Sequence, residues 1–126
     1  MTRFKSSNIV ESMSNAIRGL KLAISSQRNF VIEVIIAIVA FILAIFLGFT
    51  SADKCILLIM IAIVLVCEML NSVIEFTLDA VYKNSYSKLV EMAKDMSAGM
   101  VLLVAIISIV VGLFLYYPYI IKLLIK

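Results

Sequence analysis

The sequence contains little of what soluble enzymes and metal proteins usually carry. It has no histidine, two cysteines and four glycines, and only 15% of its 126 residues are charged, whereas about a quarter are charged in a typical soluble domain. Cys55 and Cys67 are the two cysteines, and both lie in one apolar run. Without histidine, two separated cysteines do not make a structural zinc site. The scarcity of glycine also leaves no glycine-rich loop that could cradle a nucleotide phosphate.

Apolar residues, in contrast, make up 64% of the chain, and the mean hydropathy is +1.17. They are concentrated in long runs, and they outnumber what the core of one soluble domain of this length could bury. This composition excludes a soluble enzyme, a disordered tail and a secreted disulfide scaffold. It predicts a small integral membrane protein with a single membrane domain over residues 1–126.

The net charge of +3 comes from 11 Lys and Arg against 8 Asp and Glu. The basic residues form no dense patch, so the charge does not indicate a nucleic-acid partner. A modest positive charge fits contact with anionic lipid headgroups.

An amphipathic surface helix is predicted over about residues 8–26. Its apolar residues recur at helical spacing along one stripe, and its basic residues lie mostly off that stripe, which is typical of a helix lying on a membrane. The stripe consists of Ile9, Val10, Met13, Ile17, Leu20 and Ile24.

Three transmembrane helices are predicted after it, because about 20 apolar residues span a bilayer. They cover residues 30–49, 55–82 and 89–117, and the second extends into the cytoplasm. A polar turn is expected at residues 50–54, and Pro118 is expected to end or kink the third helix. The predicted fold class is therefore an all-α membrane protein.

The distribution of basic residues predicts the orientation. The N-terminal segment and the second connection carry eight of them, while the first connection and the C-terminus carry three: Arg3, Lys5, Arg18, Lys21, Arg28, Lys83, Lys88 and Lys94, against Lys54, Lys122 and Lys126. Since cytoplasmic segments are enriched in Lys and Arg, we expect the N-terminus in the cytoplasm and the C-terminus outside.

Four polar residues in the second span carry the candidate chemistry. Glu68, Asn71, Glu75 and Asp79 are spaced +3, +4 and +4, so they share one helix face. Intramembrane carboxylates are costly and are normally functional or paired, and their oxygens suit a divalent cation. The alternative is that these residues line a wet helix end above the bilayer.

A second polar group, Glu91, Lys94 and Asp95, begins the third span. An acidic metal site beside a cation is what phosphoryl transfer requires: metal to bridge phosphates, lysine to neutralise charge and a carboxylate to accept a hydroxyl proton. Taken alone, Lys94 could equally snorkel from the helix end or pair with Glu91.

Together, these residues resemble the prokaryotic diacylglycerol kinase family, which includes undecaprenol kinases. The resemblance rests on the string E-x-x-N-S-x-I-E-x-x-x-D over residues 68–79 and A-K-D over 93–95, and it covers nearly the whole chain. It implies a homotrimer, each subunit with a surface helix and three transmembrane helices. It also implies transfer of the ATP γ-phosphate to a lipid hydroxyl, with Mg²⁺, at the cytoplasmic surface of a bacterial membrane.

The resemblance implies roles for individual residues. Glu68 matches the general base, Asn71 an active-site polar residue and Glu75 a metal-binding carboxylate. The positions that match nucleotide contacts are Lys94, Asp95, Ser85, Tyr86, Ser87, Asn8 and Asn15.

Two positions depart from the family pattern. Gln27 stands where the family usually has a second metal-binding glutamate, and its amide offers an oxygen without a charge. Asn8 aligns with an arginine that meets ATP in some members, and Arg3 and Lys5 are the nearby cations.

These departures leave an alternative open, a family member whose activity has faded and which binds without turnover. A small membrane transporter is a further alternative, although its carboxylate is usually in the first of four spans. Of the two lipid alcohols, undecaprenol is favoured over diacylglycerol because residues 28–30 look more like the Gram-positive branch.

Overall fold

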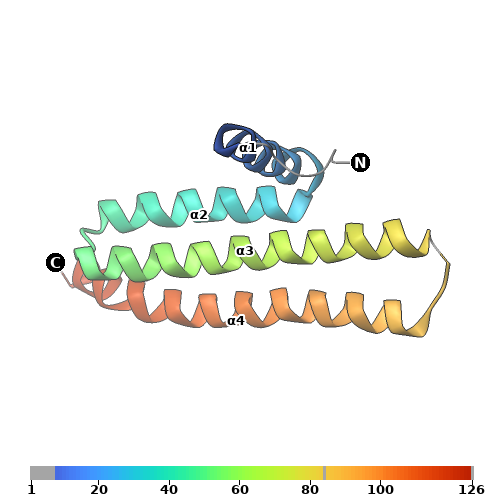
Figure 1. Cartoon of the computed structure of the whole chain (residues 1–126). Coiled ribbons are helices and arrows are strands. Elements are labelled where there is room, and N and C mark those ends of the chain that lie inside the picture. Colours follow the sequence, from blue (N-terminus) through green and yellow to red (C-terminus); the bar gives the residue numbers. More distant parts are fainter. Residues whose placement is uncertain (1–7, 84, 126) are drawn as a thin grey trace.

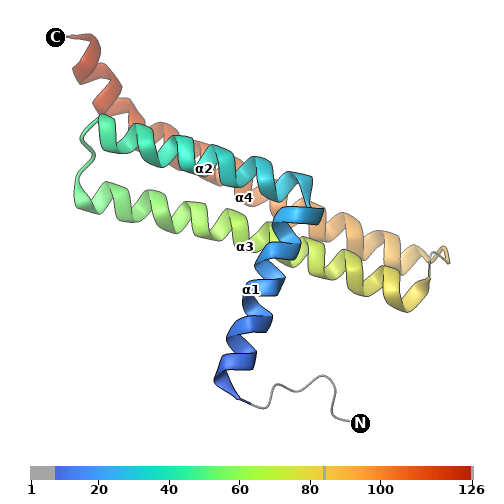
Figure 2. The same ribbon diagram turned by 90° about the horizontal axis from the view of Figure 1, so that it is seen from above.

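The computed structural model describes residues 8–83 and 85–125. Arg3, Lys5 and Lys126, which entered the predictions above, lie outside these residues. The described chain forms four helices: α1 (Ile9–Ser26), α2 (Arg28–Phe46), α3 (Ser51–Tyr82) and α4 (Lys88–Leu124). Helices α2, α3 and α4 lie side by side, each antiparallel to the next in sequence (Figure 1). Helix α1 crosses this bundle and projects away from it (Figure 2).

The bundle exposes most of its large apolar side chains. Helices α2, α3 and α4 are each long and apolar enough to cross a membrane, and the buried apolar residues in the described chain are few: Ala23, Phe30, Ala44, Phe49 and Leu57. In water such a surface would drive association. It is the surface expected of a bundle that is surrounded by lipid or by further membrane helices.

The turn between α2 and α3 differs from the prediction. Residues 47–49 were predicted to belong to the first span, but α2 ends at Phe46 because Gly48 adopts a positive φ of 73°. The Phe49 and Gly48 N–H groups donate to the carbonyls of Ala44 and Ile45 at 3.0 and 3.1 Å, which is a Schellman motif.

Helix α3 also begins earlier than predicted. Residues 51–54 were predicted as a polar turn, but they form the first turn of α3 because Thr50 caps it. The Thr50 hydroxyl accepts a hydrogen bond from the Asp53 N–H at 3.2 Å. Such an N-cap satisfies one of the backbone donors that a helix start leaves without partners.

Helix α4 continues past its predicted end at Tyr117. It contains Pro118 and runs to Leu124, and it bends near its C-terminal end (Figure 2). A proline removes one helical hydrogen bond and bends the helix, so Pro118 does not end α4.

Aromatic side chains join the α2–α3 turn to α4. The Tyr119 hydroxyl donates to the Asp53 carboxylate at 2.5 Å and accepts from the Thr50 N–H at 3.1 Å. Phe49 is 3% exposed, and its ring stacks on that of Tyr119 with centroids 4.3 Å apart. The Tyr116 hydroxyl donates to the Ala40 carbonyl. We call Phe49, Thr50, Asp53, Tyr116 and Tyr119 the aromatic clasp.

The aromatic clasp leads to a prediction on stability. Replacing Tyr119 by Phe keeps the ring stack but removes both hydrogen bonds of the hydroxyl. We expect the midpoint of thermal unfolding in detergent micelles to fall by about 3–6 °C. Tyr117→Phe is the matched control because the Tyr117 side chain is exposed. Equal midpoints for the two variants would show that the hydroxyl of Tyr119 contributes nothing to stability.

Candidate active site

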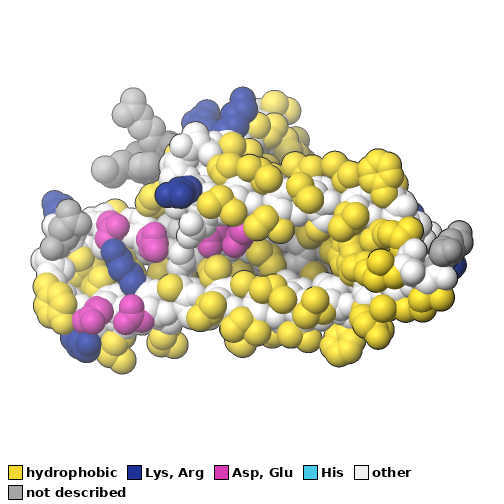
Figure 3. All heavy atoms as spheres, turned by 180° about the vertical axis from the view of Figure 1, so that it is seen from behind, with side chains coloured by type: hydrophobic (Ala, Val, Ile, Leu, Met, Phe, Trp, Pro, Cys, Tyr) yellow, Lys and Arg dark blue, Asp and Glu magenta, His cyan; other side chains and the backbone are white. Residues whose placement is uncertain are grey.

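Charged side chains gather toward the end of the bundle where α3 connects to α4, while the rest of the same face is apolar (Figure 3). Glu68 lies on α3 and is only 3% exposed, and Ser72 one turn later is 6% exposed. The side chain of Asn29, at the start of α2, interacts with the Glu68 carboxylate. A carboxylate held in this way within a membrane helix is a candidate for chemistry rather than for packing.

Asn71 uses both ends of its amide, one in a contact with α4 and the other in a contact within α3. Its oxygen accepts a hydrogen bond from the Ser97 hydroxyl at 2.7 Å, and its nitrogen donates to a Glu75 carboxylate oxygen at 3.4 Å. Ser97 is 5% exposed. We call Asn29, Glu68, Asn71, Glu75 and Ser97 the polar network. It places two carboxylates and an amide on one wall, as the spacing in α3 predicted.

Glu33 adds a third carboxylate beside the polar network. It interacts electrostatically with Glu68, and its Oε2 atom is buried without a hydrogen-bond partner in the described part of the chain. Glu33 also lines an apolar cleft of about 410 Å³ between α2, α3 and α4. The cleft extends toward Gly112 and Tyr116, so an apolar chain lying in it would have one end next to the carboxylates.

A second concave region lies where α3 connects to α4. This hairpin-tip pocket has a volume of about 320 Å³, and its polar lining comes from Asp79, Tyr82, Ser85, Tyr86, Ser87, Glu91 and Lys94. Within it, the Lys94 ammonium is 2.6 Å from the Asp79 carboxylate.

Glu91 is held by two neighbours in the same pocket. Its carboxylate accepts a hydrogen bond from the Tyr86 hydroxyl at 2.8 Å and pairs with Lys88 at 3.1 Å. This carboxylate raises the pKa of Tyr86, because deprotonation would lose the hydrogen bond and place two negative charges together. The Tyr86 side chain therefore remains a neutral donor that ties the connection to α4.

The remaining predicted site residues lie apart from these two groups. Gln27 is at the junction of α1 and α2, and its amide nitrogen donates to Ser26 at 3.4 Å. Asp95 is exposed on α4.

Asn8 accepts a hydrogen bond from the Glu11 N–H and caps α1, at the end that projects from the bundle (Figure 2). Asn15 is exposed on α1, and neither asparagine lines the hairpin-tip pocket.

A divalent cation needs several oxygen ligands within a short distance of one another. Residues 8–83 and 85–125 contain no group of three or more His, Cys, Asp or Glu that could enclose a metal ion. Mg²⁺, however, is usually bound by one or two carboxylates together with substrate phosphates and waters. The single Glu75 carboxylate fits a Mg²⁺ that arrives with a nucleotide and is completed by phosphates and waters. It does not fit a permanent metal cage.

Sequence reasoning missed three contacts of this region. Ser97 was assigned no role, although it is three residues from Lys94 and so shares its helix face. Asn29 was treated as part of a family pattern and not as a partner of Glu68. The ion pair of Asp79 with Lys94 was not anticipated, and no sequence signal in a single chain reveals it.

Three helices that can span a membrane, with a carboxylate-rich polar network toward one end, indicate an integral membrane protein with a candidate active site. Residues 14–116 match the family described as prokaryotic diacylglycerol kinase. The chain is 31% identical to a diacylglycerol kinase of Synechocystis sp. over 118 residues, which is 94% of this chain and 67% of that one. It is 29% identical to an undecaprenol kinase of Bacillus subtilis over 108 residues, 86% and 87% of the two chains.

The chain therefore belongs to the prokaryotic diacylglycerol kinase family. By this membership it is a membrane lipid kinase. The resemblance found in the acidic string of α3 and in the A-K-D of α4 is confirmed.

Proposed function

We propose that this chain transfers the γ-phosphate of ATP to the hydroxyl of a membrane lipid alcohol at the cytoplasmic surface of a bacterial membrane. The favoured lipid is undecaprenol, and diacylglycerol is the second candidate. The observation that carries the proposal is the burial of Glu68 in the polar network on the same helix as the hairpin-tip pocket. Glu68 and Asp79 are 11 residues apart, roughly 16 Å along a helix. A lipid alcohol requires a base at the depth of the membrane, and a nucleotide requires a cation near the water surface.

The proposed reaction assigns one task to each group. The lipid chain lies in the apolar cleft, and its hydroxyl meets the Glu68 carboxylate. Glu68 takes the hydroxyl proton as the lipid oxygen forms a bond to the γ-phosphorus, and the bond from that phosphorus to the bridging oxygen of ADP breaks. Lys94 neutralises phosphate charge, while Asp95 and residues 85–87 contact the rest of the nucleotide. Asn71 orients Glu75 through the amide contact at 3.4 Å.

The proposed metal ligands are Glu75 and, with a neutral oxygen, Gln27, which lies at the junction of α1 and α2 and has to approach Glu75 if both are to hold one ion. Bound Mg²⁺ would offset the negative charge of the nucleotide phosphates. Asn8 and Asn15 are proposed to meet the nucleotide from α1. In the described chain they are remote from the pocket, so this assignment requires α1 of the same or another subunit to approach it.

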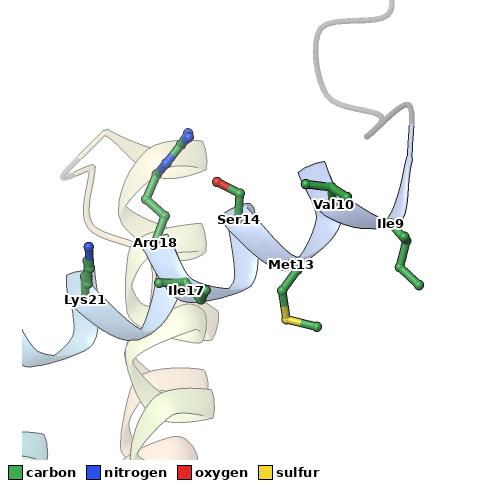
Figure 4. Close-up of a pocket in the computed structure, with 7 residues that line it drawn as sticks. All are labelled: Ile9, Val10, Met13, Ser14, Ile17, Arg18 and Lys21. Atoms are coloured by element: carbon green, nitrogen blue, oxygen red, sulfur yellow. The ribbon is translucent and has the colours of Figure 1, made fainter.

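The proposed assembly is a homotrimer in which α1 lies on the membrane surface, with the N-terminus in the cytoplasm and the C-terminus outside. Figure 4 supports the placement of α1, since Ile9 and Met13 extend away from the side on which Arg18 and Lys21 extend. Ile9 is 81% exposed and Met13 is 60% exposed. An apolar side that is uncovered in one chain and a basic side opposite it suit the interface between lipid and water.

The experiment that tests the function is transfer of radiolabelled γ-phosphate from ATP in mixed micelles, with undecaprenol and diacylglycerol run side by side. Label in undecaprenyl phosphate alone, or in greater amount, supports the proposal. Label mainly in phosphatidic acid would move the chain to the diacylglycerol branch. No label in either lipid, with folded protein and ample Mg²⁺, would contradict phosphoryl transfer and favour the second candidate, a family member that binds without turnover. Gln27 and Asn8 are the observations that motivate that candidate.

Gln27 also leads to a prediction. If its amide is a neutral metal ligand, Gln27→Glu restores a charge at this position, and we expect the Mg²⁺ concentration for half-maximal activity to fall about tenfold. The measurement is initial rate against Mg²⁺ at fixed ATP. Ser26→Ala is the control, because it removes the hydrogen-bond partner of Gln27 without adding charge. An unchanged Mg²⁺ titration for Gln27→Glu would place residue 27 outside the metal shell.

A further inference from the structure

Asp79 is the member of the acidic face of α3 to which the proposed mechanism assigns no task. Its carboxylate is 2.6 Å from the Lys94 ammonium, and the two side chains are 51% and 37% exposed. Lys94 is also the group proposed to neutralise nucleotide phosphates. In the described structure, therefore, the cation needed by the substrate is already occupied by a carboxylate of the same chain.

The ion pair of Asp79 and Lys94 is placed where a nucleotide could displace it. Both residues line the hairpin-tip pocket, and an ion pair as exposed as this one is weak, because water and salt screen it. A polyphosphate carries more charge than one carboxylate and binds an ammonium more strongly.

The other carboxylate of this pocket differs from Asp79. Glu91 is held by Tyr86 and Lys88 and makes no contact with Lys94 that the structure records. Removing the charge of Glu91 therefore changes the field in the pocket but leaves the ion pair of Lys94 intact. The chain thus contains a matched control for the effect of Asp79.

We propose that Asp79 is a displaceable counter-ion that holds Lys94 in the resting enzyme and lowers the apparent affinity for ATP. This inference rests on the proposed function, because it concerns the nucleotide site of the same reaction. Asp79 acts through Lys94 and is a positioning residue, not a catalytic one. Each time ATP binds, the ion pair of Lys94 with Asp79 must first be broken. Removing the charge of Asp79 should therefore lower KM for ATP and leave kcat unchanged.

The experiment compares Asp79→Asn, Glu91→Gln and wild type in the phosphate-transfer assay with varied ATP. We expect Asp79→Asn to lower KM for ATP about two- to fivefold, the range of a weak exposed ion pair, with kcat within a factor of about two. Glu91→Gln should lower KM by less. In a Lys94→Ala background, Asp79→Asn should have no effect on KM, because the two residues would no longer be coupled.

Each other result overturns the inference. A higher KM for Asp79→Asn would mean that the carboxylate holds Lys94 in a productive position or binds metal. Equal decreases in KM for Asp79→Asn and Glu91→Gln would show that the effect comes only from the overall negative charge of the pocket. A decrease in KM that persists in the Lys94→Ala background would exclude the ion pair as its cause. The dissociation constant of ATP, measured by titrating the protein with ATP in the presence of Mg²⁺, gives a readout that is independent of turnover. Hence a wild type that phosphorylates neither lipid would overturn the proposed function, while the titration would still decide the role of Asp79.

Discussion

Glu68→Gln is expected to lower lipid phosphorylation by a factor of about 10²–10⁴, the usual contribution of a general base. Glutamine has the size of glutamate and keeps an oxygen that can accept hydrogen bonds, but it cannot take a proton from the lipid hydroxyl. The fold should survive, because the substitution removes a buried charge that interacts electrostatically with Glu33 and Glu75. Thermal unfolding in detergent should therefore occur at the same temperature as in wild type, or higher.

The measurement for Glu68→Gln is the initial rate of phosphate transfer at saturating ATP and lipid, together with the unfolding midpoint. Cys67→Ala is the matched control, since it alters the adjacent, partly buried position of α3 and should retain most of the activity. Loss of activity in both variants would indicate damage to the helix and not to a base. Turnover retained by Glu68→Gln would remove Glu68 from the reaction, and the base would have to be sought elsewhere.

Glu75→Gln is expected to raise the Mg²⁺ concentration for half-maximal activity by tenfold or more and to lower the maximal rate by a factor of about 10². Glu75 is the single charged residue among the proposed metal ligands, because Gln27 is neutral. Its loss would leave the metal only neutral protein oxygens and the nucleotide phosphates. The measurement is the rate against Mg²⁺ at several ATP concentrations.

Two further variants sharpen the test of Glu75. Glu91→Gln removes the same charge with the same change of shape, but from α4 outside the polar network, and should leave the Mg²⁺ requirement nearly unchanged. The double variant Gln27→Glu with Glu75→Gln should recover part of the Mg²⁺ affinity if the two positions share one ion. An Mg²⁺ titration of Glu75→Gln that superimposes on that of wild type would exclude this residue as a ligand.

The parts of the site that lie within one helix were predictable from the sequence. Glu68, Asn71 and Glu75 share a face of α3 because helical spacing alone places them there, and the acidic string carries the family resemblance. The partners that complete the polar network were not predictable. Asn29 and Ser97 come from other helices, and their contacts depend on how α2 and α4 are rotated against α3, which residue spacing does not determine.

Helix ends and α1 show the same limit. Apolar length placed the end of the first span three residues too late, because hydropathy cannot detect that Gly48 turns the backbone or that Thr50 begins the next helix. Asn8 was assigned to the nucleotide by its alignment with an arginine. The structure uses its side chain as a helix cap, which competes with any ligand for the same oxygen. Its role at the nucleotide stays a prediction.

The aromatic clasp also has a mechanical consequence. It fastens α2, α3 and α4 together at the end opposite the hairpin tip, so a rigid tilt of the paired α3 and α4 about the clasp would move the tip most. Helix α3 contains 32 residues, and at 1.5 Å per residue its arm is roughly 48 Å long, so that a tilt of about 5° displaces the tip by about 4 Å. Small changes in packing at the clasp would therefore cause larger displacements at the distant tip. Substitutions that loosen the clasp would then alter nucleotide binding in the hairpin-tip pocket without changing any residue of that pocket.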